Sequence, residues 1–111
     1  MLIERGYVYW VRFDESMGEE IQKTRPAIVL SNNAANLALK RVQVVPITSK
    51  THRVYPGEAI VELHGEKRKA IASQITTASK LRLGTKFGVL GSEDIARVEA
   101  AIAVQLGLNL K

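Results

Sequence analysis

The stretch YVYWVRF, residues 7–13, decides the fold class of this chain. Its aromatic and β-branched residues favour strands, and they alternate, with Tyr7, Tyr9, Val11 and Phe13 on one side. Successive side chains of a strand point to opposite faces of a sheet. The stretch therefore predicts a β-strand with one apolar face.

Further short segments carry strand signals on the way to the end of the chain. After Pro26, AIVLS predicts a buried strand that begins at the proline, because proline has no N–H to donate within a sheet. The stretch RVQVVPITS predicts another strand, in which Pro46 indicates an edge, a bulge or a bend. Three more strands are expected in EAIVEL (58–63), AIASQIT and FGVLG, with HGEKRK as a hairpin-like turn.

Helical signals accompany these strands. The stretch SNNAANLALK predicts a helical turn or two capped by Ser31 or Asn32. The end of the chain predicts a longer helix, which Ser92 caps and Gly107 ends. Its apolar residues at helical spacing are Ile95, Val98, Ile102 and Leu106. Short antiparallel strands followed by one terminal helix predict a mostly β fold with some α, in the form of a small barrel with short helices.

Length and composition narrow the class of protein. With 111 residues, the chain is expected to form a single domain, residues 1–111, with its own core. The absence of cysteine excludes disulfides, thiolate zinc sites and cysteine nucleophiles. No apolar run approaches the roughly 18 residues that span a bilayer, and no signal peptide is expected. We expect a soluble, cytoplasmic protein without a membrane partner.

Positive charge gathers in two acid-free segments of a chain whose net charge is +5. The first lies between Glu20 and Glu58, and the second lies between Glu66 and Glu93. Their cations are Lys23, Arg25, Lys40, Arg41, Lys50, Arg53, Lys67, Arg68, Lys69, Lys80, Arg82 and Lys86. Folded onto one face, these segments would attract a polyanion, and basic loops in solvent are the alternative.

Familiar cofactor and metal motifs are missing from the sequence. There is no GxGxxG or Walker loop, so nucleotide-cofactor chemistry is not expected. His52 and His64 lack metal-ligand spacing to each other and to a nearby acid pair, so no metal site is predicted. Two histidines could supply a base and an acid for RNA cleavage, but exposed loop histidines are the expected interpretation.

Arg25 stands out by its placement. Pro26 directly after it restrains its backbone to extended conformations, so the guanidinium sits at a fixed entry to a strand. Such a fork can bind two phosphate oxygens at once. At the end of another strand, Thr48 and Ser49 offer hydroxyls beside Lys50. The two strand ends could meet in an anion site, and an ordinary strand entry with a β-favouring threonine is the alternative.

Four segments match one set of motifs in order over nearly the whole chain. They are RGYVYWVRFD, GEEIQKTRPAIVLSNN, VQVVPITS and AIASQITTASKLRLGTKFGVLGSEDIARVEAAIAVQLGL. Together they resemble the MazF/PemK family of toxins, the RNA-cleaving halves of toxin–antitoxin pairs. The resemblance implies the small SH3-like β barrel shared with the gyrase poison CcdB, usually as a homodimer. It also implies neutralisation by an antitoxin with a flexible acidic segment.

The resemblance further implies an activity and site residues. The activity is metal-independent, sequence-specific cleavage of single-stranded RNA by the 2′-OH, which leaves 2′,3′-cyclic phosphate and 5′-hydroxyl ends. Arg25 takes the place of the family's essential arginine, Thr48 that of its threonine or serine, and Glu20 that of a loop glutamate that could deprotonate the 2′-OH. Segments expected to line the RNA groove contain Ser31, Asn32, Ser49, Lys50, His52, Arg53, Ser73 and Gln74.

Two departures and two alternatives accompany the resemblance. Thr24 and Ser73 differ from residues common in the family, so the cut sequence cannot be carried over. Trp10 is expected in the core or at a dimer interface, with stacking on a base as the alternative. A gyrase-poisoning binder like CcdB, or a catalytically silent barrel that binds RNA or an antitoxin, is the alternative function. The presence of both Arg25 and Thr48 favours the nuclease.

Overall fold

The computed structural model describes residues 2–13 and 23–109 of the chain. Its strands are β1 (Tyr7–Phe13), β2 (Lys23–Val29), β3 (Arg41–Thr48), β4 (Glu58–Leu63), β5 (Glu66–Ile71), β6 (Thr76–Ser79) and β7 (Leu83–Val89). Its helices are α1 (Asn33–Ala38), α2 (Ser92–Leu106) and the 3-10 turns η1 (Ala72–Gln74) and η2 (Lys80–Arg82). The predicted mostly β fold with short helices and a C-terminal helix is confirmed.

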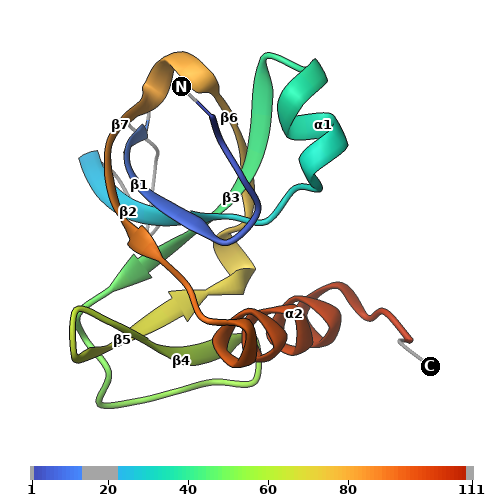
Figure 1. Ribbon diagram of the computed structural model, residues 1–111. Coiled ribbons are helices and arrows are strands. Elements are labelled where there is room, and N and C mark those ends of the chain that lie inside the picture. The colour runs from blue at the N-terminus through green and yellow to red at the C-terminus, as the bar shows by residue number, and fades with distance from the viewer. Residues whose placement is uncertain (1, 14–22, 110–111) are drawn as a thin grey trace.

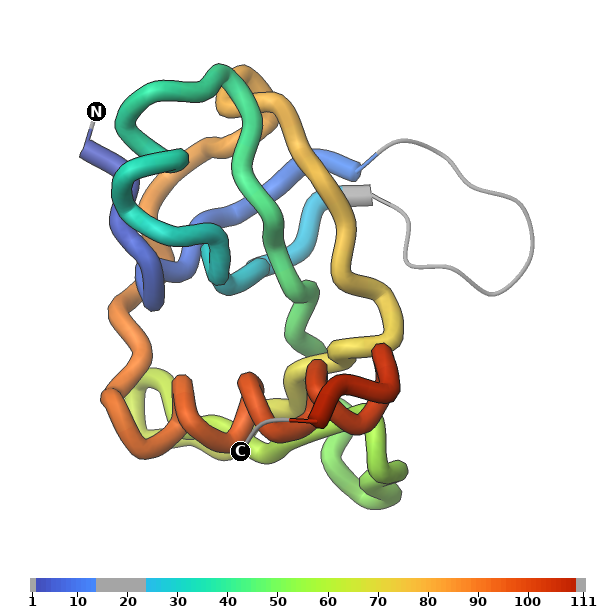
Figure 2. The backbone as a smooth tube through the Cα atoms, turned by 90° about the vertical axis from the view of Figure 1, so that its right-hand side faces the viewer, coloured from blue at the N-terminus to red at the C-terminus, as the bar shows by residue number. Residues whose placement is uncertain are grey.

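The strands form one antiparallel path in the order β4-β5-β3-β2-β1-β7, and β6 also pairs with β3. Figures 1 and 2 show a curled upper part that contains β1, β2, β6 and β7, and a lower part in which β4 and β5 lie beside α2. Strand β3 passes from one part to the other. Among the described residues, no pairing joins β7 to β4 or β6, so the sheet is strongly curled without a continuous closing ladder.

The two strand prolines lie where a ladder partner is missing on one side. The β1–β2 ladder begins with the pair Phe13 and Lys23, whereas the β2–β3 ladder begins only with the pair Ala27 and Pro46. Pro26 therefore stands inside β2, which corrects the prediction that the strand begins there, and it tolerates the position because only β1 flanks it. Pro46 lies between the β6 and β5 ladders of β3, at the crossing between the two parts, as its predicted bend requires.

The central strands bury both faces, so alternate residues enter two different cores. Val8 and Ile28, which are paired across β1 and β2, belong to the core beneath α2. Their neighbours Tyr9 and Ala27 belong to the core inside the curled upper part. This two-sided burial explains why AIVLS is a continuous apolar run rather than an alternating one.

The β4–β5 hairpin differs from the sequence prediction. Only His64 and Gly65 form the turn, with φ angles of 56° and 74°, as a two-residue hairpin turn requires. The residues after them, Glu66–Ile71, are strand β5, and the predicted strand AIASQIT is divided among β5, η1 and β6. The prediction missed β5 because its first four residues are charged and were assigned to a turn.

The C-terminal helix packs against β4, as predicted, with differences at both ends. Gly91 holds the N-cap position and Ser92 is the first helical residue, so the predicted cap was one residue late. Asp94 is buried and accepts a hydrogen bond of 2.8 Å from the Glu62 N–H of β4. Leu106 is 55% exposed and lies outside the packed face. Gly107 ends the helix in the left-handed region, as predicted.

Among the described helices, none has the length and apolarity needed to cross a membrane.

Candidate active site

A pocket of about 270 Å³ opens where β2 and β3 meet β5. Its lining residues are Trp10, Thr24, Arg25, Pro26, Ile47, Thr48, Ser49 and Arg68. We call it the arginine pocket, because two guanidinium groups enter it from different strands. It brings together Arg25 with Thr48 and Ser49, the two strand ends that the sequence analysis expected to meet.

Strand register explains why Arg25 and Thr48 meet. The β2–β3 ladder pairs Ala27 with Pro46, so continuing it by two residues places Arg25 opposite Thr48. On the other side of β2, Arg25 pairs with Val11 of β1, a fully buried residue. Arg25 is thus held in a paired strand at the edge of a core, and its position does not depend on a loop.

Each guanidinium group of the arginine pocket contains a buried donor that is unpaired within the described part of the chain. The Nε atoms of Arg25 and Arg68 are buried, and neither has a hydrogen-bond partner among the described residues. A buried donor without a partner costs about 1–3 kcal/mol, and more for a charged group. Such a cost in an otherwise well-paired fold indicates donors that are kept available for an anionic ligand.

Aromatic rings form one wall beside Arg68. Its guanidinium carbon lies 4.9 Å from the centre of the Phe87 ring, and Trp10 meets the same ring edge-on at 5.4 Å. Trp10 is 39% exposed and lines the arginine pocket, so it does not lie in the core of the subunit. This leaves an indole surface beside the two guanidinium groups.

The end of β3 presents hydroxyls at the pocket. The backbone N–H of Lys50 donates to Thr48 Oγ1 over 3.3 Å, which bends the chain directly after the strand. Because that oxygen accepts this bond, the Thr48 proton remains free to be donated to a ligand. Ser49 and Lys50 are exposed beside it.

The basic loop after β3 is anchored by an ion pair. Lys69 Nζ lies 3.1 Å from a Glu58 carboxylate oxygen and donates to the Arg53 carbonyl over 2.9 Å. The Arg53 guanidinium donates to the Tyr55 hydroxyl over 3.2 Å, and it is exposed, as is His52. The loop therefore presents two basic side chains from an anchored backbone.

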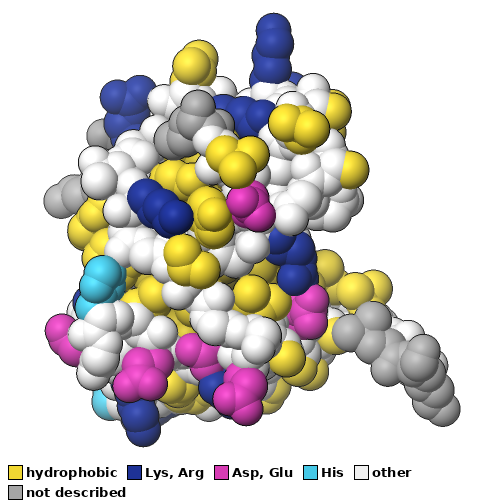
Figure 3. Space-filling view, in the orientation of Figure 1, with side chains coloured by type: hydrophobic (Ala, Val, Ile, Leu, Met, Phe, Trp, Pro, Cys, Tyr) yellow, Lys and Arg dark blue, Asp and Glu magenta, His cyan; other side chains and the backbone are white. Residues whose placement is uncertain are grey.

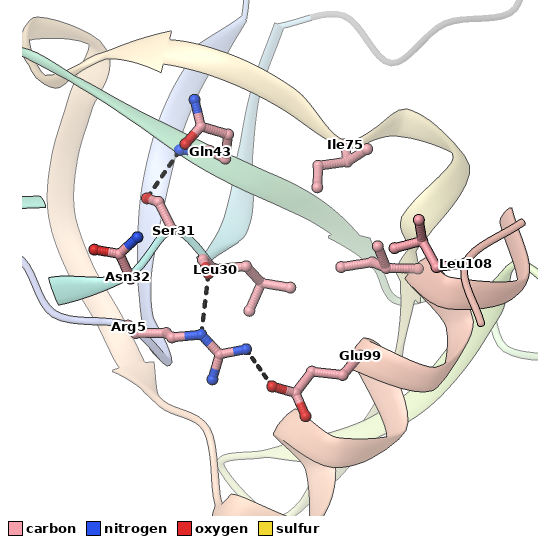
Figure 4. Close-up of a pocket in the computed structure, with 9 residues that line it drawn as sticks. Arg5, Leu30, Ser31, Asn32, Gln43, Ile75, Glu99 and Leu108 are labelled. Carbon is pink, nitrogen blue, oxygen red and sulfur yellow. Dashed lines mark hydrogen bonds and ion pairs between the residues drawn. The ribbon is translucent and has the colours of Figure 1, made fainter. Parts of the chain in front are cut away.

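Other predicted site residues lie elsewhere. A second pocket, of about 560 Å³, is lined by Arg5, Leu30, Ser31, Asn32, Gln43, Ile75, Glu99, Ile102 and Leu108. We call it the helix-side pocket, because α2 forms one wall (Figure 4). Asn32 caps α1 by accepting from the Ala35 N–H, and Ser31 Oγ accepts from the Gln43 N–H over 3.1 Å. Ser31 and Asn32 are therefore not brought beside Arg25.

The remaining candidates lie away from the arginine pocket or outside the described residues, and one lining residue was missed. Ser73 is exposed and Gln74 is half-buried in η1, and neither lines the arginine pocket. Glu20 lies outside the described residues. Arg68 was missed, since the sequence analysis assigned its segment to a turn. The two residues His64 and Gly65 were the available signal, because a two-residue turn ending in glycine would have placed a strand directly after it.

Charge is unevenly distributed over the surface. Figure 3 shows most of its acidic side chains over the lower part, where β4, β5 and α2 lie, and basic side chains over both parts. One basic group forms where the Lys80 N–H donates to the Lys40 carbonyl and Arg41 pairs with Ser79. The two acid-free segments thus contribute to several basic regions rather than to one cluster. Among the described residues, no three acidic or histidine side chains are grouped to hold a metal ion.

Known proteins resemble this chain over almost its full length. The sequence profile of a family described as PemK-like, MazF-like toxin of type II toxin–antitoxin system matches residues 4–106. Endoribonuclease MazF9 of Mycobacterium tuberculosis is 30% identical over 116 residues, with 96% of this chain and 98% of the relative covered. The endoribonuclease toxin MazF of Escherichia coli is 34% identical over 111 residues, with 94% of each protein covered.

Solved structures give the same assignment. MazF from Deinococcus radiodurans superposes with a TM-score of 0.84 at 25% identity, covering 97% of this chain and 99% of its own. A mycobacterial endoribonuclease in complex with its cognate antitoxin superposes with a TM-score of 0.81 at 25% identity, covering 98% of this chain and 99% of its own. The resemblance seen in the sequence motifs is confirmed. This chain belongs to the family of PemK-like, MazF-like toxins of type II toxin–antitoxin systems.

Proposed function

We propose that this toxin is an endoribonuclease that cleaves single-stranded RNA at specific short sequences without a metal ion. The observation that carries the proposal is the Arg25 guanidinium, whose buried Nε has no partner in residues 2–13 and 23–109, in a pocket that also contains Thr48. The curated relatives that match nearly the whole chain are endoribonucleases. A gyrase-poisoning binder would have no need of an unpaired arginine beside a strand-end hydroxyl.

The proposed reaction is an internal transesterification. The 2′-oxygen of one nucleotide attacks the adjacent phosphorus, and the bond from phosphorus to the 5′-oxygen of the next nucleotide breaks. The products are a 2′,3′-cyclic phosphate and a 5′-hydroxyl, which takes up one proton while the 2′-OH loses one. The reaction uses no water molecule and, as proposed, no metal ion. The protein therefore supplies the positioning, the positive charge and the proton transfer.

The residues have distinct roles in this reaction. Arg25 stabilises the additional negative charge on the pentacoordinate phosphate, which in many enzymes is the largest catalytic contribution. The Thr48 hydroxyl donates a hydrogen bond to a phosphate oxygen and orients the phosphate for attack. Glu20 is the proposed base on the strength of the sequence motif alone. Ser49, Lys50, His52 and Arg53 contact the RNA beside the cut, and Ser31, Asn32, Ser73 and Gln74 stay predictions for the wider groove.

The proposed partner is an antitoxin whose flexible acidic segment occupies the RNA site. Solved structures that resemble this chain include a toxin with its cognate antitoxin. A disordered acidic segment can fold onto a basic site and satisfy the same donors that would bind phosphate. We further propose that the toxin acts as a cytoplasmic homodimer, which size-exclusion chromatography with light scattering would test.

The test is RNA cleavage in EDTA by the wild-type toxin and by Arg25→Ala. Wild type should cut a mixed single-stranded RNA and leave 2′,3′-cyclic phosphate and 5′-hydroxyl ends, as mapped by end-specific labelling. Arg25→Ala should leave the RNA almost intact. Uncut RNA with wild type, equal cutting by the variant, or 5′-phosphate ends would each contradict the proposed mechanism.

A further inference from the structure

Arg68 is the group in the arginine pocket to which the proposed reaction assigns no role. It lies half-buried in β5 opposite Val61, on a strand whose exposed residues are Glu66 and Lys67. Its buried Nε has no hydrogen-bond partner among the described residues, which is the same condition as that of Arg25. A single scissile phosphate accounts for one such guanidinium and leaves the second unexplained.

The strand order separates Arg68 from Arg25. The β3–β5 ladder pairs Thr48 with Lys69, so its continuation places Arg68 opposite Ser49. Continuation of the β2–β3 ladder places Arg25 opposite Thr48 on the other side of β3. Because β3 lies between β2 and β5, the two arginines enter from strands that are two positions apart. Strands at that separation lie roughly 10 Å apart. The two guanidinium groups therefore approach the pocket from its two sides.

The contact with Phe87 fixes the orientation of Arg68. Its guanidinium carbon lies 4.9 Å from the ring centre, so the ring restrains the side chain. A cation–π contact uses no N–H donor, so the donors of the fork remain available to a bidentate anion. A group held in this way is suited to bind phosphate at a fixed place, since little side-chain entropy is lost on binding.

We propose that Arg68 binds a second phosphate of the RNA strand, at a linkage next to the one that is cut. This inference rests on the proposed function, because it takes single-stranded RNA as the ligand of the pocket. Arg25 holds the phosphate that reacts, and Arg68 holds a neighbouring one, so the strand is fixed on both sides of β3. Arg68 is a positioning residue, and it sets a requirement for substrates with more than one phosphate.

The first test measures RNA binding without cleavage. An RNA strand with a deoxynucleotide at the cut site lacks the nucleophile and stays intact. Arg68→Ala should weaken its binding about 10- to 100-fold, the loss expected for charge-assisted hydrogen bonds. The slope of log affinity against log salt should fall by about 0.7, as for one lost phosphate contact on a single strand.

Lys67→Ala is the matched control. Lys67 is the exposed neighbour of Arg68, it pairs with Glu62, and it does not line the arginine pocket. The variant removes the same charge from the same strand, but on the opposite face. It should therefore leave the RNA affinity and its salt dependence nearly unchanged. Arg68→Lys keeps the charge and stem if Arg68→Ala fails to fold, and it should weaken binding several-fold because an ammonium lacks the fork.

The second test locates the phosphate. A neutral methylphosphonate is placed at one linkage at a time in the same uncleaved strand. Wild type should lose affinity at one linkage adjacent to the cut, and Arg68→Ala should be insensitive to that substitution because the contact is already absent. Sensitivity of both proteins at the same linkages would overturn the proposal, as would an effect of Arg68→Ala on the cut phosphate alone.

The outcomes separate this inference from the proposed nuclease activity. Cleavage by wild type together with equal binding by Arg68→Ala and Lys67→Ala would overturn the role of Arg68 and leave the nuclease proposal standing. Absence of cleavage by wild type would contradict the nuclease proposal. The slope of log affinity against log salt on intact RNA would still decide whether Arg68 contacts a phosphate. An effect of Arg68→Ala on an acidic peptide but not on RNA would also overturn the inference.

Discussion

The two pockets of this toxin both contain arginine, but they treat it differently. In the helix-side pocket, Arg5 donates to the Leu30 carbonyl over 3.0 Å and forms an ion pair with Glu99 (Figure 4). In the arginine pocket, Arg25 and Arg68 leave buried Nε donors without partners among the described residues. Arg5 joins the segment directly after β2 to α2, whereas Arg25 and Arg68 retain their capacity to bind an anion.

This difference teaches how to tell a structural cation from a functional one. Both pockets contain arginine beside apolar residues, so the presence of a cation does not by itself separate them. The separation comes from hydrogen-bond satisfaction, because evolution of a stable fold pairs buried donors unless a ligand pairs them. Substitutions in the two pockets therefore test this distinction directly.

The largest effect is expected for Arg25→Ala. Removing a preorganised donor to a transition-state oxyanion typically costs 10²–10³ in rate, or about 3–4 kcal/mol. Cleavage of a defined RNA should fall by about that factor in kcat/KM, while the urea midpoint stays close to wild type because no protein hydrogen bond of the described residues is lost. Arg25→Lys is the control, and it should recover only part of the rate, since it keeps charge without the fork. Full activity in either variant would erase the contrast between the pockets.

The next effect concerns stability at Asn36, which bonds to Ser31 in the lining of the helix-side pocket. Asn36 is 1% exposed, donates to the Ser31 carbonyl over 2.8 Å and accepts from the Ser31 hydroxyl. Asn36→Ala leaves these groups unpaired and should lower the free energy of unfolding by about 2 kcal/mol. RNA cleavage per folded molecule should not change. Leu37→Ala, on the same helix and 79% exposed, is the control that should change neither urea midpoint nor rate.

The fold was largely predictable from the sequence because period and turn chemistry agree along most of the chain. YVYWVRF alternates as an antiparallel strand must, and Gly107 ends the last helix in the left-handed region. Two features were missed. Strand β5 begins with four charged residues, which indicate a turn as readily as a strand, and Pro26 sits inside a strand because the β2–β3 ladder starts one residue later. Both depend on tertiary neighbours rather than on local preference.

The site was predictable only in part. Arg25 and Thr48 could be expected together because Pro26 restrains Arg25 and Thr48 ends another predicted strand, and the pocket contains both. The family resemblance strengthened that expectation without locating other members of the pocket. Arg68 could not be expected, because its approach depends on β5 pairing with β3 across about 20 residues of chain, and no local pattern records that pairing.

A third prediction probes the hydroxyl of the arginine pocket. Thr48→Val has nearly the same shape and removes only the oxygen that accepts from the Lys50 N–H and could donate to phosphate. We expect kcat/KM for RNA cleavage to fall about tenfold, or about 1.4 kcal/mol, as for one hydrogen bond to a charged group. Thr48→Ser should retain most of the rate, because it keeps the hydroxyl. A valine variant as active as wild type would leave Arg25 as the pocket's only supported contact to the scissile phosphate.

The smallest effect is expected for the Arg5–Glu99 pair, whose side chains are 31% and 47% exposed. A double-mutant cycle with Arg5→Met and Glu99→Gln should give a coupling energy of about 0.5 kcal/mol in urea unfolding, because solvent and side-chain entropy offset most of the attraction. The coupling should fall towards zero in about 1 M salt, where the screening length is about 3 Å. All three variants should cleave RNA at the wild-type rate, since Arg5 has its donors occupied within the fold. A loss of cleavage in Arg5→Met as large as that in Arg25→Ala would show that hydrogen-bond satisfaction does not separate the two pockets, and that an arginine paired in the free toxin can exchange its partner for RNA.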